Sequence, residues 1–170
     1  VMTLSEGLWP ANVDRGQIGQ VFSNMVINAD QAMPDGGTLS VAAHNVRISE
    51  PVPHPDLVPG CYVQVDISDT GTGISASDLH KIFDPFFSTK ERGSGLGLTT
   101  AYAIVRKHGG CIRIASAPGT GTTFSIYLPA VLQPPVQERT DRDVSVKGHG
   151  RVLVVDDEVT VQHVLTAMLD

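Results

Sequence analysis

The sequence predicts an α+β two-layer sandwich, in which helices cover a mixed, mostly antiparallel sheet. Two observations predict this class. Helical and strand patterns follow one another as helix, strands, helix, strands, and glycine-rich turns separate the strand patterns. The chain has 170 residues and is 41% hydrophobic, which is enough for one good core and a fragment of a second.

The first helix is expected over residues 14–33. Asp14 is a good N-cap, apolar residues recur behind it at helical spacing, and the sequence PDGG ends the pattern. Two asparagines, Asn24 and Asn28, lie one turn apart on the same face of this helix. A buried amide costs free energy unless it is hydrogen-bonded or coordinated. The pair therefore needs partners, and the sequence leaves open whether these are backbone groups or a ligand.

The remaining elements follow from alternation and capping. Strand patterns occupy residues 38–48, 62–69, 111–116 and 122–128, and the four prolines of residues 50–60 indicate a loop. The first strand pattern changes parity near His44, which a β-bulge would explain. A second helix is expected over residues 97–108, because cationic side chains fill its last turn and Gly109 follows as a cap.

Three segments are expected along the chain. Residues 1–130 form the α+β domain, residues 131–149 are a polar, proline-bearing linker, and residues 150–170 begin an α/β domain. The last segment pairs an apolar run with a helical pattern, which amounts to one strand and one helix of a truncated fold. The opening VMTLSEGLWP reads as the interior of a longer protein.

Composition excludes several classes of function. The net charge is −6 and no Lys/Arg cluster occurs, which argues against nucleic-acid binding but not against an anionic ligand held by backbone amides. No apolar run approaches the roughly 20 residues of a membrane span, and no secretory signal is visible. Cys61 and Cys111 fit no zinc or disulfide pattern, which suits a reducing, cytoplasmic location.

The sequence DTGTGI, residues 69–74, joins a buried strand face to a glycine turn. Asp69 continues the apolar face of the preceding strand, so its carboxylate points at the core and must find hydrogen-bond donors. The two glycines, Gly71 and Gly73, let a flat ligand approach the backbone without meeting a Cβ atom. A purine amino group is one suitable donor, and an ordinary Asp-Gly turn is the alternative.

Two further glycine motifs carry polar groups. GSGLGL, residues 93–98, opens the second helix, where backbone N–H groups can face a phosphate, although such glycines also make a hinge. It matches neither the dinucleotide fingerprint nor a Walker loop. GTGTTF, residues 119–124, places Thr122 on the core face of a strand, where it can meet a ligand's polar edge or pack by its methyl group.

The four motifs together indicate one pocket. Amide oxygens suit Mg²⁺, which takes its other ligands from water and phosphates. An asparagine pair, an inward Asp before a glycine turn, a glycine anion site and a Gly-Thr hairpin supply the contacts of Mg-ATP, in this order along the chain. ATP and Mg²⁺ are the expected ligands.

With these motifs the chain resembles the catalytic ATP-binding domain of sensor histidine kinases, within the Bergerat-fold (GHKL) ATPases. QVFSNMVINADQAMPDGG resembles the family's asparagine box, DTGTGI and GSGLGL its glycine boxes, and FDPFFSTK its phenylalanine box. GTGTTF resembles its final hairpin. The resemblance covers about residues 4–130 and implies a protein-histidine kinase, of which this chain holds the catalytic domain only.

The resemblance implies a role for each motif. Asn28 would be the main Mg²⁺ ligand, with Asn24 in support, and Asp69 would bind the adenine amino group. Residues 75–94 would form a mobile ATP lid, from which Lys90 could reach the terminal phosphate. Phe83, Phe86 and Phe87 would be apolar anchors of this lid and could also dock a partner domain. The other residues expected to bind ATP are Gly71, Gly73, Ile74, Gly93, Ser94, Gly95, Leu96, Gly97, Leu98 and Thr122.

Asn24 separates the chain from its water-activating relatives, which carry a glutamate at this position. An amide cannot accept a proton at neutral pH, so Asn24 cannot activate a water molecule as a general base. The pocket would then hold ATP for phosphoryl transfer to a histidine. None of the six histidines lies in the setting that the family uses, so the acceptor is expected on a separate dimerisation domain. A nucleotide-sensing pseudokinase and a self-contained ATPase are the alternatives.

The C-terminal segment resembles the start of a response-regulator receiver domain. RVLVVDDE places Asp156 and Asp157 at the carboxyl end of a strand, where receivers hold Mg²⁺. The phosphoacceptor aspartate of a receiver is absent, so this metal site is incomplete. A hybrid kinase, with kinase and receiver in one chain, is the expected parent protein.

Overall fold

The computed structural model describes residues 1–50, 56–89, 93 and 95–132. The expected linker and receiver start, including Asp156 and Asp157, lie outside the described residues, as do Lys90 and Ser94. The elements are β1 (Met2–Leu4), α1 (Arg15–Ala32), β2 (Leu39–Ile48), β3 (Gly60–Asp69), α2 (Gly97–Lys107), β4 (Cys111–Ala117) and β5 (Gly121–Pro129).

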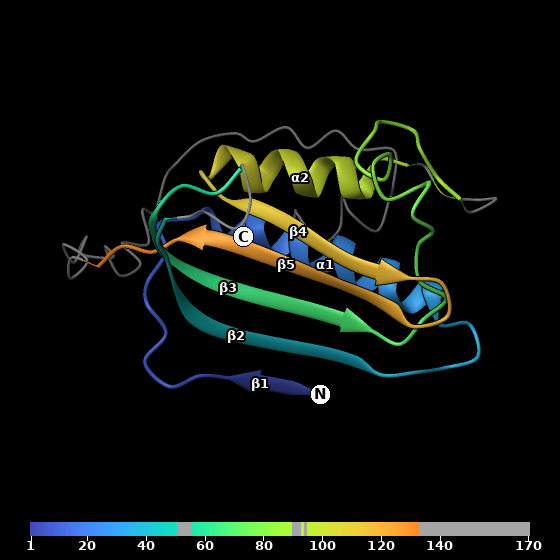
Figure 1. Cartoon of the computed structure of the whole chain (residues 1–170), viewed down its shortest axis with the longest axis horizontal. Coiled ribbons are helices and arrows are strands. Elements are labelled where there is room, and N and C mark those ends of the chain that lie inside the picture. Colours follow the sequence, from blue (N-terminus) through green and yellow to red (C-terminus); the bar gives the residue numbers. More distant parts are fainter. Residues whose placement is uncertain (51–55, 90–92, 94, 133–170) are drawn as a thin grey trace, which may run out of the picture. The chain divides into compact units, whose positions relative to one another are not determined.

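The strands form one mixed sheet in the order β1-β2-β3-β5-β4 (Figure 1). β1 runs parallel to β2, and every other neighbouring pair is antiparallel. Both helices pack on the same face of this sheet, where their apolar side chains join those of β3, β4 and β5 in one core. The predicted α+β two-layer fold is confirmed.

α1 forms where its cap and its apolar spacing predict it. The Asp14 side chain accepts a hydrogen bond from the Gln17 backbone N–H at 2.9 Å, which satisfies one of the free donors of the first turn. Ile18, Val21 and Met25 recur on the buried face, and Val21 and Met25 are completely inaccessible to solvent. Burial of this face fixes the rotation of the helix about its axis, and so determines which side chains of α1 lie outside the core.

A second, smaller apolar cluster lies on the other face of the sheet. Tyr62 of β3 and Tyr127 of β5 meet edge to face at 6.4 Å, and Leu57 from the preceding loop covers them. Cys111 is buried in this cluster, and its burial raises the pKa of the thiol. Cys61 and Cys111 are free thiols, as the sequence predicts.

Two details differ from the sequence predictions. The prediction of a β-bulge near His44 is wrong, because β2 and β3 pair without interruption from Leu39 opposite Asp69 to Ile48 opposite Gly60. β1 was not predicted, since three exposed residues carry no alternation and the strand exists through its pairing with β2. No helix among the described residues is long and apolar enough to cross a bilayer.

Candidate functional site

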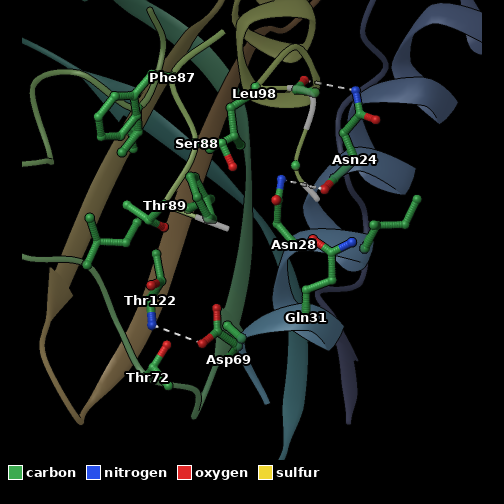
Figure 2. A pocket seen from close by; sticks show the side chains of 18 of the residues that line it. Asn24, Asn28, Gln31, Asp69, Thr72, Phe87, Ser88, Thr89, Leu98 and Thr122 are labelled. Carbon is green, nitrogen blue, oxygen red and sulfur yellow. Dashed lines mark hydrogen bonds between the residues drawn. The ribbon is translucent and has the colours of Figure 1, made fainter. Parts of the chain in front are cut away.

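A cavity of about 540 Å³ opens between α1, the ends of β3 and β5, and the segment that leads into α2 (Figure 2). This volume is typical of small-molecule sites. The predicted residues that line it are Asn24, Asn28, Asp69, Gly73, Ile74, Gly93, Gly95, Gly97, Leu98 and Thr122. Of the remaining described candidates, Gly71 supports the wall without lining the cavity, and Leu96 lies half-exposed at the start of α2.

Asp69 closes the base of the cavity and is 8% exposed. The backbone N–H of Gly71 donates to its Oδ1 at 2.8 Å, and the backbone N–H of Thr122 donates to the same oxygen at 3.2 Å. Figure 2 shows the second carboxylate oxygen directed into the cavity. Because one oxygen is held by the protein backbone, the other is oriented to accept a hydrogen bond from a ligand.

The wall around Asp69 is built by close contacts between two glycine turns. A Cβ at Gly73, where φ is +70°, would come within 2.1 Å of the Ala117 carbonyl oxygen. A Cβ at Gly121, where φ is +92°, would come within 1.9 Å of the Asp69 carbonyl oxygen. The Gly119 N–H also donates to the Thr72 carbonyl at 2.7 Å. Only glycine allows this approach, so the turn after β3 and the β4–β5 hairpin form one continuous surface.

The opposite wall carries the two asparagines of α1. Asn24 donates its Nδ2–H to the backbone carbonyl of Gly97 at 2.9 Å. Asn28 donates its Nδ2–H to the backbone carbonyl of Asn24 at 2.8 Å. A carbonyl can only accept, so these bonds fix which end of each amide is nitrogen. Both side chains are half-buried and line the cavity, where Figure 2 shows them on one side of it.

The first turn of α2 supplies backbone donors next to Asn24. Its first intrahelical bond runs from the Thr100 N–H to the Leu96 carbonyl. The N–H groups of Gly97, Leu98 and Thr99 precede that bond and have no acceptor within the helix. Gly97 and Leu98 line the cavity, so this positive helix end faces the space that an anionic ligand would occupy.

Comparison with known proteins agrees with this geometry. Residues 13–132 match the family model of the histidine kinase-, DNA gyrase B- and HSP90-like ATPases. The chain belongs to this ATPase family. Membership implies that the domain binds ATP.

The relatives of this ATPase domain are sensor kinases. The chain is 39% identical to the sensor kinase CckA of Brucella abortus (strain 2308), over 91% of this chain and 18% of that protein. It is 37% identical to the sensor histidine kinase ZraS of Escherichia coli (strain K12), over 75% of this chain and 24% of that protein. The chain therefore spans between about a sixth and a quarter of the length of these relatives.

A solved structure shares the fold of the ATPase domain. The catalytic domain of the histidine kinase ThkA aligns with a TM-score of 0.61 and 28% sequence identity, covering 76% of each chain. The architecture described above is therefore the one found in histidine kinase catalytic domains.

In the described part of the segment expected to form the lid, two of the three phenylalanines are anchored. Phe83 lies 4.8 Å from the ring of Tyr102, and Phe87 packs on the core and lines the cavity. Phe86 is 77% exposed and has a φ of +66°, which is strained for a bulky side chain. The expectation that Phe86 is an apolar anchor is wrong, because its side chain is exposed and only its backbone packs against Gly95.

Several cavity residues of the ATPase domain were not predicted. Gln31 extends the row of amides on α1, and the helical spacing from Asn28 could have revealed it. Ser88 and Thr89 add hydroxyl groups from a segment without periodicity, so no local pattern could place them. Thr72 lies between the two glycines of the first turn and lines the base of the cavity.

Proposed function

We propose that this domain binds Mg-ATP in the cavity and donates the γ-phosphate to a histidine on a separate dimerisation domain of a sensor histidine kinase. The observation that carries the proposal is the hydrogen bond from Asn24 to the Gly97 carbonyl. An amide that donates to a carbonyl cannot take a proton from water, so the cavity has no general base at the position where the water-activating relatives carry one.

The base end of the cavity suits adenine. The Asp69 oxygen that faces the cavity can accept from the amino group of the purine. Gly73 and Ile74 line the cavity beside it and Gly71 supports this wall, while Thr72 between the two glycines adds a hydroxyl. Thr122 lies beside Asp69 in the next strand and offers a hydroxyl to the same edge of the ligand. These residues would bind the base and orient the nucleotide.

The phosphate end suits magnesium and a triphosphate. The Nδ2 atoms of Asn24 and Asn28 donate to backbone carbonyls, so the amide oxygens are the atoms of these side chains that are suited to a cation. Asn28 would be the main Mg²⁺ ligand and Asn24 a supporting one. Bound Mg²⁺ would neutralise the charge of the phosphates. The backbone groups of Gly93, Gly95, Gly97 and Leu98, which line the cavity, would hold the phosphates themselves.

Lys90 and Ser94 remain predictions as additional phosphate contacts, because they lie outside the described residues. The described part of the lid offers the hydroxyl groups of Ser88 and Thr89 to the same end of the cavity. Each lid contact would orient the terminal phosphate for in-line attack, and positioning and electrostatics are what phosphoryl transfer requires.

The histidine acceptor belongs to another domain in this proposal. Among the described residues, no histidine lines the cavity, and His108 is committed to the Ile104 carbonyl and the Asp14 N–H at the far end of α2. The exposed Phe86 of the lid segment is a contact point that such a domain could cover. The dimerisation domain is therefore the proposed partner.

We also propose that the chain continues into a receiver domain. The match to CckA covers 91% of 170 residues, about 155, so part of it must extend beyond residue 132. The proposed organisation is a catalytic domain over residues 1–130, a linker over 131–149 and a receiver start over 150–170. Asp156 and Asp157 would belong to the receiver's Mg²⁺ site, and the receiver would be the second phosphotransfer partner.

Labelling with radioactive ATP tests the proposal. The chain is incubated with Mg²⁺, ATP labelled in the γ-phosphate and a separately expressed dimerisation domain that carries the acceptor histidine. We expect acid-labile label on that domain, lost with Asn28→Ala and retained with Ser125→Ala, which lies on the other face of the sheet. Bound ATP without transfer would instead support a nucleotide sensor. Hydrolysis without an acceptor that disappears in Asn28→Ala would support an ATPase.

A further inference from the structure

Ser116 of β4 lies behind the base end of the cavity and connects its two glycine turns. Its Oγ accepts the Ile74 N–H at 2.8 Å, lies 2.9 Å from the Gly121 carbonyl oxygen and lies 2.9 Å from the Thr122 Oγ1. Ser116 does not line the main cavity itself. It touches a residue of each turn and the threonine that does line the cavity.

The protons of this cluster can be assigned by counting donors. The Gly121 carbonyl has no proton, so its bond with Ser116 requires the single hydroxyl proton of Ser116. The Ser116 oxygen then has two lone pairs, and one of them takes the Ile74 N–H. The bond between the two hydroxyls can form only if Thr122 donates its proton to Ser116. The Thr122 hydroxyl is thereby left with lone pairs alone for a ligand.

Asp69 lies directly beside this hydroxyl. Asp69 and Thr122 are paired residues of β3 and β5 on the same face, and the Thr122 N–H binds Asp69 Oδ1. Figure 2 shows both side chains at the base of the cavity. A carboxylate oxygen and an acceptor-only hydroxyl together form a pair of acceptors, and this pair is complementary to a group with two N–H protons.

We propose that Ser116 is a positioning residue that sets the selectivity of the site for a 6-amino purine over a 6-oxo purine, acting by holding the Thr122 hydroxyl as an acceptor. This inference rests on the proposed function. A 6-amino group supplies two donors to the acceptor pair, directly or through one water molecule. A 6-oxo group places another acceptor against the pair and leaves polar atoms unpaired, which discriminates strongly in a buried site.

The test compares ATP with ITP, because their bases differ only in the 6-position and the proton on N1. Dissociation constants for both nucleotides with Mg²⁺ are measured by competition in the chain and in Ser116→Ala. Loss of the Ile74 and Gly121 bonds should weaken both nucleotides alike. Without Ser116, the Thr122 hydroxyl is free to donate its proton to the 6-oxo group of ITP. The preference for ATP over ITP should therefore shrink about 3- to 10-fold.

Ser125→Ala is the matched control. Ser125 lies three residues after Thr122 in the same strand, and its hydroxyl donates to Asp66 on the opposite face of the sheet. This variant should keep the ATP:ITP ratio of the unmodified chain. A ratio in Ser116→Ala equal to that of Ser125→Ala would overturn the inference and leave Ser116 a merely structural residue.

Two variants of Thr122 test the same idea with Ser116 intact, and remain informative should Ser116→Ala fail to fold. Thr122→Ser keeps the hydroxyl and should keep the ratio, whereas Thr122→Val removes the acceptor and should reduce it. In the Thr122→Val background, Ser116→Ala should have no further effect on the ratio. An unchanged ratio in Thr122→Val also overturns the inference. Failure of the unmodified chain to bind either nucleotide would contradict the proposed function instead.

Discussion

The two ends of the cavity are built in different ways. The base end consists of backbone packed against backbone, with Asp69 held by two N–H groups and a Cβ excluded at Gly73 and Gly121. The phosphate end consists of side-chain amides on α1 and backbone groups at the start of α2, and a Cβ at Gly97 would lie 3.7 Å from its nearest neighbour. The base end is therefore preformed. At the phosphate end Gly95 is packed closely against the Phe86 backbone, but the first turn of α2 at Gly97 has room to adjust to a ligand.

The largest effect is expected from Gly121→Ala at the base end. The new Cβ would lie 1.9 Å from the Asp69 carbonyl oxygen, at a φ of +92° that an L-residue rarely adopts. Relief of the clash must separate the two turns. We expect a loss of about 3 kcal/mol or more in the free energy of unfolding. Urea denaturation measures the stability, and calorimetric titration with Mg-ATP should detect no binding.

Two other glycines provide the controls for this substitution. Gly119 has a similar φ of +76° with nothing within 4 Å of its Cβ position, so Gly119→Ala should cost only the backbone strain, about 1 kcal/mol. Gly97→Ala makes the same change at the phosphate end and should fold with near-normal stability. Equal losses in all three variants would contradict the distinction between a preformed and an adaptable end.

Asp69→Asn should have the next largest effect. The amide oxygen can still accept from the Gly71 and Thr122 N–H groups, but this leaves the amide nitrogen facing the cavity as a donor. The new amide N–H and the purine amino group are both donors, so they could not form a hydrogen bond with each other. We expect the Kd for ATP to rise about 10- to 100-fold, the range for a lost hydrogen bond to a charged group. Fluorescence competition measures it, and an unchanged Kd would remove Asp69 from the base site.

Local patterns predicted the elements and much of the site because both depend on neighbours in sequence. The helix cap at Asp14, the apolar face of α1 and the parity that turns Asp69 inwards are all short-range features. Thr122 likewise follows from alternation in β5. These features place the side chains before the fold is known, since helical and strand periodicity dictates which face each one shares.

Long-range contacts account for what the sequence could not predict. The partner of Asn24 is the Gly97 carbonyl, 73 residues away, so the choice between backbone and ligand could not be made from the helix alone. Ser116 acquires its connections only when β4 pairs with β5. The same holds for Leu57, which a proline-rich loop brings to the second apolar cluster.

Asn24→Asp tests the phosphate end directly. The carboxylate cannot donate to the Gly97 carbonyl, and two acceptors would face each other across 2.9 Å. Because this end is adaptable, we expect a modest loss of stability, about 1–2 kcal/mol, and a Kd for Mg-ATP raised roughly 10-fold. Ser23→Asp adds the same charge at the neighbouring exposed position and should change neither value substantially. A loss as large as that of Gly121→Ala would show that the phosphate end is as rigid as the base end.

The smallest effect is expected at the cap of α1, the helix that carries the amide wall. The hydrogen bond from the Gln17 N–H lowers the pKa of Asp14 below the ordinary value of 3.8. A lowered pKa in the folded state favours folding above that ordinary value and ceases to do so as the pH falls below the folded pKa.

The difference in unfolding free energy between the unmodified chain and Asp14→Ala should therefore be largest at pH 7 and should narrow towards pH 3. Asp14→Asn keeps a capping oxygen that cannot ionise, so it should lose little at pH 7, and its difference from the unmodified chain should shrink as the pH falls. Urea denaturation at the two pH values measures these differences. A gap to Asp14→Ala that stays constant with pH would show that the cap acts without its charge. In that case the hydrogen bond that the Asp14 oxygen accepts, and not its negative charge, would stabilise the start of the helix that carries Asn24 and Asn28.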